Sequence, residues 1–267
     1  MTAIKRLAWV TDIHLEWVEP PQVDAFCRSI IEAGADALVI SGDIATARSV
    51  EKYLRQIEKH LQRRIYFVLG NHDFYDGSIG GVRDAMRTLS QQSSWLHWLP
   101  GADVVELSNS TGLVGHDGWA DGRFGDYAHS RVQLNDYLLI ADLLDPHTRL
   151  AKLNALGDEA AAHFREVLPR ACARFRRIVL ITHAPPFKEA CWHQGHLSDD
   201  NWLPHFACKA VGEALIEVMQ RWPDRELLVL CGHTHSPGVA QILPNLKVIT
   251  GGARYKAPRL QDVLEVE

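Results

Sequence analysis

Residues 6–14 read RLAWVTDIH, a short apolar run that ends in an aspartate and a histidine two positions apart. An apolar run of this length is typical of a buried β-strand. In extended backbone, side chains at i and i+2 point to the same side, so Asp12 and His14 can chelate one ion together. The stretch therefore predicts a strand that carries metal ligands at its carboxyl end.

The same pattern recurs four more times along the chain. Several of the polar groups follow a glycine, which lets the backbone turn sharply at the end of a strand. Each motif alone is weak evidence, but the carboxyl ends of strands in an open α/β sheet are where ligands bind. Five such strand ends in order therefore indicate one shared site. The four further groups are Asp43 after ALVIS, Asn71, His72 and Asp73 after RIYFVL, His183 after RIVLIT, and His233 and His235 after LLVLC.

The spacing of the apolar residues predicts the fold class. Between positions 50 and 61 they recur at i, i+4, i+7 and i+11, which indicates a helix with one buried face, and a shorter repeat follows Pro20 and Pro21. Later apolar runs, VVEL, GLVGH, LKVIT and VLEV, have fewer helices between them, although we expect helices over residues 156–170 and 207–220. The prediction is an α/β fold with an α+β tendency.

Composition limits the possible classes of protein. With 267 residues, 46% of them hydrophobic, we expect a single domain over residues 1–267. A net charge of -5 disfavours tight binding to nucleic acid, which needs a basic face. The apolar run before Asp12 is too short for a signal peptide or a membrane span, so a cytoplasmic protein without membrane attachment is expected. Five cysteines without a C-x-x-C pair predict buried, reduced thiols.

Taken together, the motifs D-x-H, G-D, G-N-H-D, a single H and G-H-x-H resemble the calcineurin-like metallophosphoesterase superfamily between Asp12 and His235. The resemblance implies a four-layer αββα sandwich of two mixed β-sheets flanked by helices. It implies that His72 faces the substrate and assists the leaving group, with Asp73 beside it to orient the ring. It also implies a binuclear site, with one ion on Asp12, His14 and His235, the other on Asn71, His183 and His233, and Asp43 as the bridge.

The residue types agree with this chemistry. Imidazole-rich ligand sets suit two divalent transition-metal ions, such as Zn, Mn, Fe, Ni or Co, better than Mg or Ca. Two ions about 3.5–4 Å apart lower the pKa of a bridging water towards about 7 and align it for attack on phosphorus. A proton from His72 to the leaving group would add about 10²–10⁴-fold in rate. The predicted function is hydrolysis of a P–O ester in a small phosphorylated molecule by a metal-bridging hydroxide.

The motifs of this chain differ from those of two known subfamilies, and these differences disfavour two classes of substrate. Protein phosphatases of the superfamily carry G-D-x-x-D-R-G and G-N-H-E, whereas this chain reads GDIATARS and GNHD, with Arg48 one position late. Lipid-precursor pyrophosphatases usually have an arginine in place of His72. The chain therefore resembles the small bacterial phosphoesterases and phosphodiesterases that act on compounds such as nucleotides or glycerophosphodiesters.

Two functions from other classes are disfavoured. A non-catalytic scaffold of this fold would have lost metal ligands or the histidine of G-N-H, and here all are present. A nuclease would need a basic, aromatic-lined groove. The sequence does not decide between diester and monoester substrates, and it leaves the oligomeric state open.

Residues 119–154 differ from the rest because polar, aromatic and charged residues are mixed without a burial period. A long irregular segment of this kind predicts an insertion or cap near the active site. We expect Trp119 and Arg123 to approach the substrate from this segment. Arg254 follows the glycines of ITGGARYK and is a further candidate for holding phosphate. Residues 192–196 follow the His183 loop and suit the rim of the site.

Overall fold

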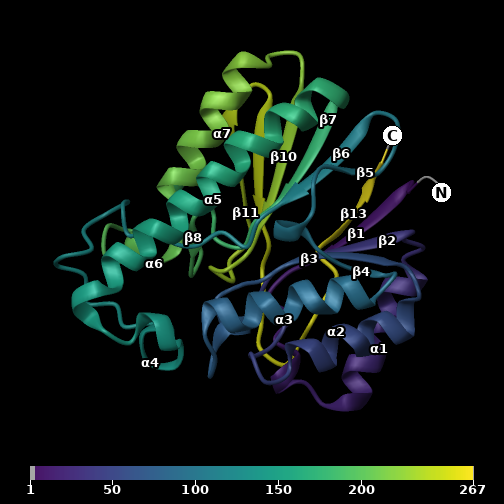
Figure 1. The fold of residues 1–267 in the computed structure, drawn as a ribbon, viewed down its shortest axis with the longest axis horizontal. Helices are drawn as coiled ribbons and strands as arrows, with labels where there is room; N and C mark the ends of the chain where they lie inside the picture. The colour runs from purple at the N-terminus through teal and green to yellow at the C-terminus, as the bar shows by residue number, and fades with distance from the viewer. Residues whose placement is uncertain (1–3, 267) are drawn as a thin grey trace.

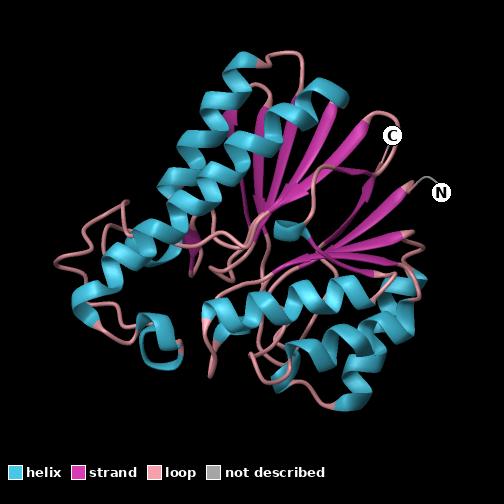
Figure 2. Cartoon of the chain, in the orientation of Figure 1, coloured by secondary structure: helices cyan, strands magenta, loops and turns pink. Residues whose placement is uncertain are grey.

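The computed structural model describes residues 4–266, which form two facing mixed sheets with helices on both outer faces (Figures 1 and 2). The predicted four-layer sandwich is confirmed. The first sheet has the order β13-β1-β2-β3-β4, in which all strands except β13 run parallel. Its strands are β1 (Arg6–Val10), β2 (Ala37–Ser41), β3 (Arg64–Val68), β4 (Leu96–Trp98) and β13 (Asp262–Glu265).

The second sheet has the order β11-β12-β10-β7-β6-β5, with antiparallel strands at its two edges. Its four central strands are parallel, so their carboxyl ends lie at one edge. The strands are β5 (Val105–Glu106), β6 (Thr111–Gly115), β7 (Arg177–Ile181), β10 (Glu226–Cys231), β11 (Gly238–Leu243) and β12 (Leu246–Thr250). A separate hairpin joins β8 (Trp192–His193) to β9 (His196–Leu197).

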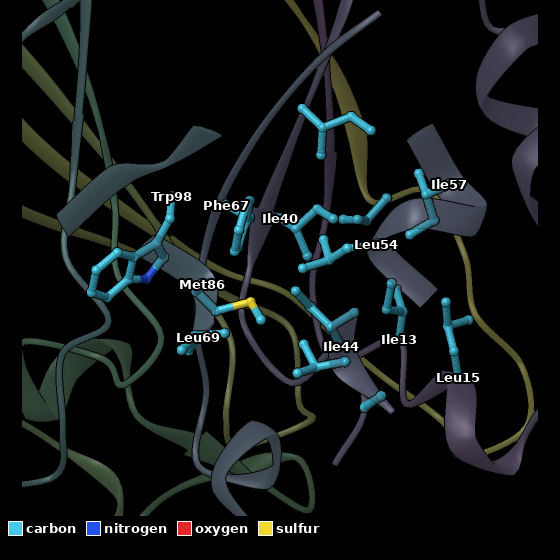
Figure 3. Packing of buried hydrophobic residues seen from close by; sticks show 14 of the residues in the cluster. Ile13, Leu15, Ile40, Ile44, Leu54, Ile57, Phe67, Leu69, Met86 and Trp98 are labelled. Atoms are coloured by element: carbon cyan, nitrogen blue, oxygen red, sulfur yellow. The ribbon is translucent and has the colours of Figure 1, made fainter. Parts of the chain in front are cut away.

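Three helices cover the outer face of the first sheet: α1 (Pro20–Glu32), α2 (Val50–Leu61) and α3 (Ile79–Gln92). Ile40 and Phe67 from the sheet pack in one cluster with Leu54 and Ile57 from α2 (Figure 3). The predicted helix over 50–61 is confirmed, whereas α3 was not predicted. Ser78 caps α3 by accepting a hydrogen bond from the backbone N–H of Gly81.

Two helices pack side by side on the outer face of the second sheet: α5 (Pro146–Arg174) and α7 (Lys209–Arg221). The expected helix over 207–220 corresponds to α7. The expected helix over 156–170 was too short, because α5 begins at the Asp145 cap, whose side chain accepts from the N–H of His147, and continues through Pro169. Two short helices, α4 (Asp136–Leu139) and α6 (Leu203–Phe206), lie at the end of the molecule away from the termini (Figure 1).

The central strands are apolar throughout because both of their faces are buried. In β1, Ala8 and Val10 face the helices, whereas Leu7 and Trp9 face the second sheet. This alternation places one hydrophobic layer between the sheets and one beneath each helical layer. All five cysteines are buried and free, as predicted. Among the described residues, no helix combines the length and apolar composition needed to cross a membrane.

A buried carboxylate joins the two sheets near the ends of their strands. Asp117, which follows β6, accepts hydrogen bonds from the Leu69 backbone N–H at 2.9 Å and the Trp98 indole N–H at 3.0 Å. Arg83 from α3 pairs with the same carboxylate at 3.0 Å, and the two side chains are 12% and 0% exposed. Asp117 therefore holds together segments from both sheets and a helix.

Replacing Asp117 with Ala should lower the free energy of unfolding by about 3–5 kcal/mol, because two buried N–H groups, of Leu69 and of the Trp98 indole, would lose their acceptor and Arg83 would keep Glu159 but lose its buried partner. Denaturant unfolding of the purified variant measures this. A matched control is Asp84→Ala, which removes the exposed pair of Asp84 with Arg87 on the same helix and should cost less than about 1 kcal/mol. Equal losses in the two variants would mean that Asp117 does not join the sheets.

Candidate metal centre

The seven candidate ligands lie together where the carboxyl ends of central strands from both sheets converge. Asp12 and His14 follow β1, Asp43 follows β2, and Asn71 lies just beyond β3. His183 follows β7 of the second sheet. The last two, His233 and His235, follow β10. Strand topology alone brings residues 221 positions apart into contact, as with His14 and His235.

One half of the cluster contains Asp12, His14, Asp43 and His235, whose ligand atoms all lie within 4.8 Å of one another. The Nε2 atoms of His14 and His235 are 3.1 Å apart. Nε2 of His235 lies 3.4 Å from Oδ1 of Asp12, and Nε2 of His14 lies 3.8 Å from Oδ2 of Asp43. Two carboxylates and two imidazoles thus face a common point.

The other half is centred on the amide oxygen of Asn71. This atom lies 3.0 Å from Nε2 of His183 and 2.9 Å from Nδ1 of His233. Oδ1 of Asp43 is 3.4 Å from Nε2 of His183, while its Oδ2 faces His14 in the first half. Asp43 is therefore the side chain that lies between the two halves.

The backbone is strained where it presents these ligands. Five of the seven have positive φ, a region that residues other than glycine seldom adopt and that is concentrated at functional sites. Gly232 shows why glycines accompany them, since a Cβ there would lie 2.0 Å from Oδ2 of Asp12. The five ligands at positive φ are Asp12 (49°), His14 (40°), Asp43 (52°), His233 (72°) and His235 (58°).

Two of the histidines have outer partners that fix their rings. Nδ1 of His183 donates to the Ser41 carbonyl at 2.8 Å, and Nε2 of His233 donates to the His205 carbonyl at 2.9 Å. A neutral imidazole has one N–H. When that N–H donates to a carbonyl, the other ring nitrogen carries a lone pair that can bind a metal ion. Those nitrogens are the ones that face Asn71, as in metal sites whose ligands are held by backbone carbonyls.

The Asn71 amide is also fixed. Its Nδ2 donates to Oδ1 of Asp136 at 2.8 Å, so its Oδ1 faces the two imidazoles. When both rings are neutral, acceptor atoms converge with no donor between them, an arrangement that a bound cation stabilises. The residues present therefore fit bound metal ions, by the chemistry of their donor atoms.

The electrostatics also show that the cluster lacks positive charge. Burial alone would raise the pKa of Asp43, but the nearby imidazoles of His183 and His72 hold it well below its usual value. Burial alone would lower the pKa of His183, yet Asp43 raises it to about 10. Without metal, a proton on His183 thus supplies part of the positive charge that the buried carboxylates require.

His72 lies beside the cluster, and one ligand atom from each of His14, Glu16 and His72 lies within 4.8 Å of the others. The ring of His72 is 4.5 Å from the ring of His14 and 4.2 Å from that of Tyr75, measured between centroids. Burial lowers the pKa of His72 to about 4. Its backbone N–H donates to Oδ1 of Asp43 at 2.9 Å, which ties the loop after β3 to the loop after β2.

Asp73 was expected to orient the ring of His72, but its carboxylate contacts backbone N–H groups. Its carboxylate is fully buried and accepts hydrogen bonds from the backbone N–H groups of Ile44 and Ala45, both at 2.9 Å, and of Gly70 at 2.8 Å. A side chain this short in a 3₁₀ turn reaches the neighbouring backbone, so Asp73 fixes the two ligand-bearing loops and not the ring.

A pocket of about 270 Å³ opens onto the candidate ligands. Asp136 and Tyr255 line it, and sequence reasoning missed both. The ring of Tyr255 lies 4.7 Å from that of His14 and 5.2 Å from that of His235. His193, expected at the rim, is part of the lining.

The three expected substrate contacts lie outside this pocket lining. Trp119 is buried in the hydrophobic core, with its ring 5.4 Å from that of Phe74. Arg123 pairs with Asp121 at 3.1 Å and with Asp158 at 2.8 Å. Arg254 is exposed, and its neighbour Tyr255 is the residue that reaches the site.

Comparison with known proteins agrees with the geometry. Among solved structures, phosphopantetheinyl hydrolase from Mycobacterium tuberculosis is similar, with a TM-score of 0.69, 14% identity, and coverage of 97% of this chain and 96% of that chain. A dimetal phosphatase from Danio rerio is similar with a TM-score of 0.62, 13% identity, and coverage of 99% and 93%. These likenesses are of fold, and no curated protein matches in sequence. Residues 5–237 match the family described as calcineurin-like phosphoesterase, and the chain belongs to that family.

Proposed function

We propose that this protein uses two divalent transition-metal ions to hydrolyse a P–O ester bond in a small phosphorylated molecule. The observation that carries the proposal is the convergence of imidazole, amide and carboxylate ligand atoms around Asn71 and Asp43 at a pocket. One ion would be held by Asp12, His14 and His235, the other by Asn71, His183 and His233, and Asp43 would contact both. Bound ions supply a water of lowered pKa as nucleophile and neutralise charge on the phosphate.

The chain's own residues give the site its shape and its proton donor. The Ser41 and His205 carbonyls hold the rings of His183 and His233 in the orientation that presents their lone pairs. His72 lines the same pocket beside His14, where it can donate to the oxygen of the departing alcohol. An anionic substrate next to this imidazole raises the pKa of the ring and so favours the form that donates.

We further propose that residues 119–154 act as a cap that shapes the pocket. Gln133, Leu134, Asn135 and Asp136 of this segment line it. The segment is fixed to the loop after β3 because the Asp76 N–H donates to the Leu139 carbonyl at 2.9 Å. These contacts give the cap a direct effect on which substrates enter.

The first test of the function is metal content. Protein reconstituted with Mn²⁺ or Zn²⁺ should contain about two ions per chain by elemental analysis. Replacing Asp43 with Ala should lower the affinity for both ions, whereas replacing His14 with Ala should empty mainly one. His129→Ala, at an exposed histidine outside the pocket, is the control and should keep both ions. Fewer than one ion in the reconstituted wild type would contradict the binuclear site.

The second test separates His72 from the ligands. His72→Ala should keep both ions but lose about 10²–10⁴-fold in kcat, because the leaving alcohol would depart without a proton. The loss should shrink for nitrophenyl esters, whose leaving group needs little proton donation. Loss of metal from the His72→Ala protein would show instead that His72 is a ligand.

A further inference from the structure

The pocket over the candidate metal centre has an unusual lining for a phosphate site. Among the described residues that line it, there is no lysine or arginine. Residues 119–154 contribute Gln133, Asn135 and Asp136 to the lining, and the rings of Phe206 and Tyr255 also line the pocket. The cations nearest in sequence to this lining, Arg254 and Lys256 on either side of Tyr255, are exposed and do not line it.

Phosphate monoesters and phosphate diesters differ in charge, and a lining without lysine or arginine suits the two classes differently. A monoester carries about 1.5 to 2 negative charges at pH 7 on three non-ester oxygens. A diester carries one charge on two such oxygens, and its second ester oxygen bears an organic group. The third oxygen of a monoester is usually held by a charge-assisted donor, most often a bidentate arginine. The described lining of the pocket offers no arginine or lysine for this oxygen.

The groups that are present favour a neutral substituent instead. Asp136 lies in the lining as a carboxylate, which repels a second negative charge on the substrate. The rings of Phe206 and Tyr255 offer apolar faces to an organic group. Phe206 is held rigidly, with its ring stacked on that of Trp202 at 5.0 Å and edge-on to that of His233 at 5.3 Å.

We propose that the site hydrolyses phosphodiesters of small alcohols and excludes phosphate monoesters, an inference that rests on the proposed function. Water adds to phosphorus, one P–O ester bond breaks, and the proton from water leaves with the departing alcohol. The products are one alcohol and one phosphate monoester. Because the monoester is a poor substrate, it accumulates and no inorganic phosphate is released.

The test compares bis(4-nitrophenyl) phosphate with 4-nitrophenyl phosphate on the metal-loaded protein, since the two differ by one nitrophenyl group. The diester should have a kcat/KM higher by about tenfold or more, which corresponds to one missing charge-assisted hydrogen bond. If the metal-loaded protein hydrolysed neither of these compounds and no other phosphate ester in a wider panel, the proposed function would be overturned. Preference for the monoester, or release of inorganic phosphate from the diester, would overturn only the substrate class.

A variant adds the group that the pocket lacks. Asn135→Arg places a guanidinium in the lining and should reduce the preference for the diester by about tenfold. The matched control is Leu138→Arg in α4, the short helix that begins directly after Asn135, at a side chain that is 71% exposed and outside the lining. It should leave the ratio of the two substrates as in the wild type. Equal effects of both arginines, or none, would contradict the proposal.

A separate observation concerns how Asn71 is held. Oδ1 of Asp136 accepts from Nδ2 of Asn71 at 2.8 Å and from the hydroxyl of Tyr75 at 2.7 Å. An amide has one oxygen and one nitrogen, and only the oxygen can bind a metal ion. A carboxylate is acceptor-only when ionised, so it selects the nitrogen and turns the oxygen towards His183 and His233.

The geometry points to Asp136 as a positioning residue for the ligand Asn71. Asp136→Ala should weaken the binding of one Mn²⁺ ion by about 10–100-fold, and Asp136→Asn, which still offers an acceptor oxygen, should weaken it less. Free Mn²⁺ counted by electron paramagnetic resonance during a titration measures both affinities. Unchanged affinity in a folded Asp136→Ala protein would contradict the role.

An Asn71→Asp background separates positioning from general structural support. A carboxylate ligand has two equivalent oxygens, so its orientation no longer needs to be selected. In that background, Asp136→Ala should cost no Mn²⁺ affinity. A loss equal to that seen with Asn71 would show that Asp136 acts only on the fold.

Discussion

The burial of two carboxylates between the sheets is the constraint on which the site depends. Asp12 and Asp43 are 2% and 1% exposed, and a charge removed from water needs compensation. Backbone N–H groups supply part of it, from His233 to Asp12 and from His72 to Asp43, both at 2.9 Å. The Thr11 hydroxyl also donates to Oδ2 of Asp12 at 2.6 Å. The nearby imidazoles add positive charge only when they are protonated. Bound metal ions would neutralise the remaining negative charge of the carboxylates, and the same ions would activate water for the proposed hydrolysis.

This constraint explains the backbone around the site. Ligands can surround the carboxylates of Asp12 and Asp43 only if strand ends from both sheets approach closely. Glycine permits that approach because it has no Cβ atom. A Cβ on Gly42 would lie 2.5 Å from Nδ1 of His183, and one on Gly70 would lie 2.2 Å from Oδ1 of Asp43. The left-handed conformations of the ligands themselves turn the side chains inward at some cost in stability. Asp73 and Asp117 offset that cost by binding the backbone of neighbouring loops.

Local patterns, namely apolar runs, glycines and polar residues at strand ends, predicted an α/β fold with one shared site at the strand ends, whereas the four-layer sandwich and the division of ligands between two ions followed from the family resemblance. Helix α3 was missed because Gly80 and Gly81 weaken the helical signal in its first turn. Asp136 and Tyr255 could not be predicted, because their contacts with Asn71 and His14 join segments 65 and 241 positions apart. Trp119 was expected to approach the substrate and is buried in the hydrophobic core. Its burial against Phe74 comes from tertiary packing that no local period records.

The most direct test of the account is the location of the metal ions themselves. Crystals grown with Mn²⁺ should give two anomalous-scattering peaks at the converging strand ends. Asp43 should contact both peaks, Asn71 should face one through Oδ1, and His14 should reach the other through Nε2. A single peak, or peaks that do not contact Asp43, would contradict the binuclear centre on which the proposed hydrolysis rests.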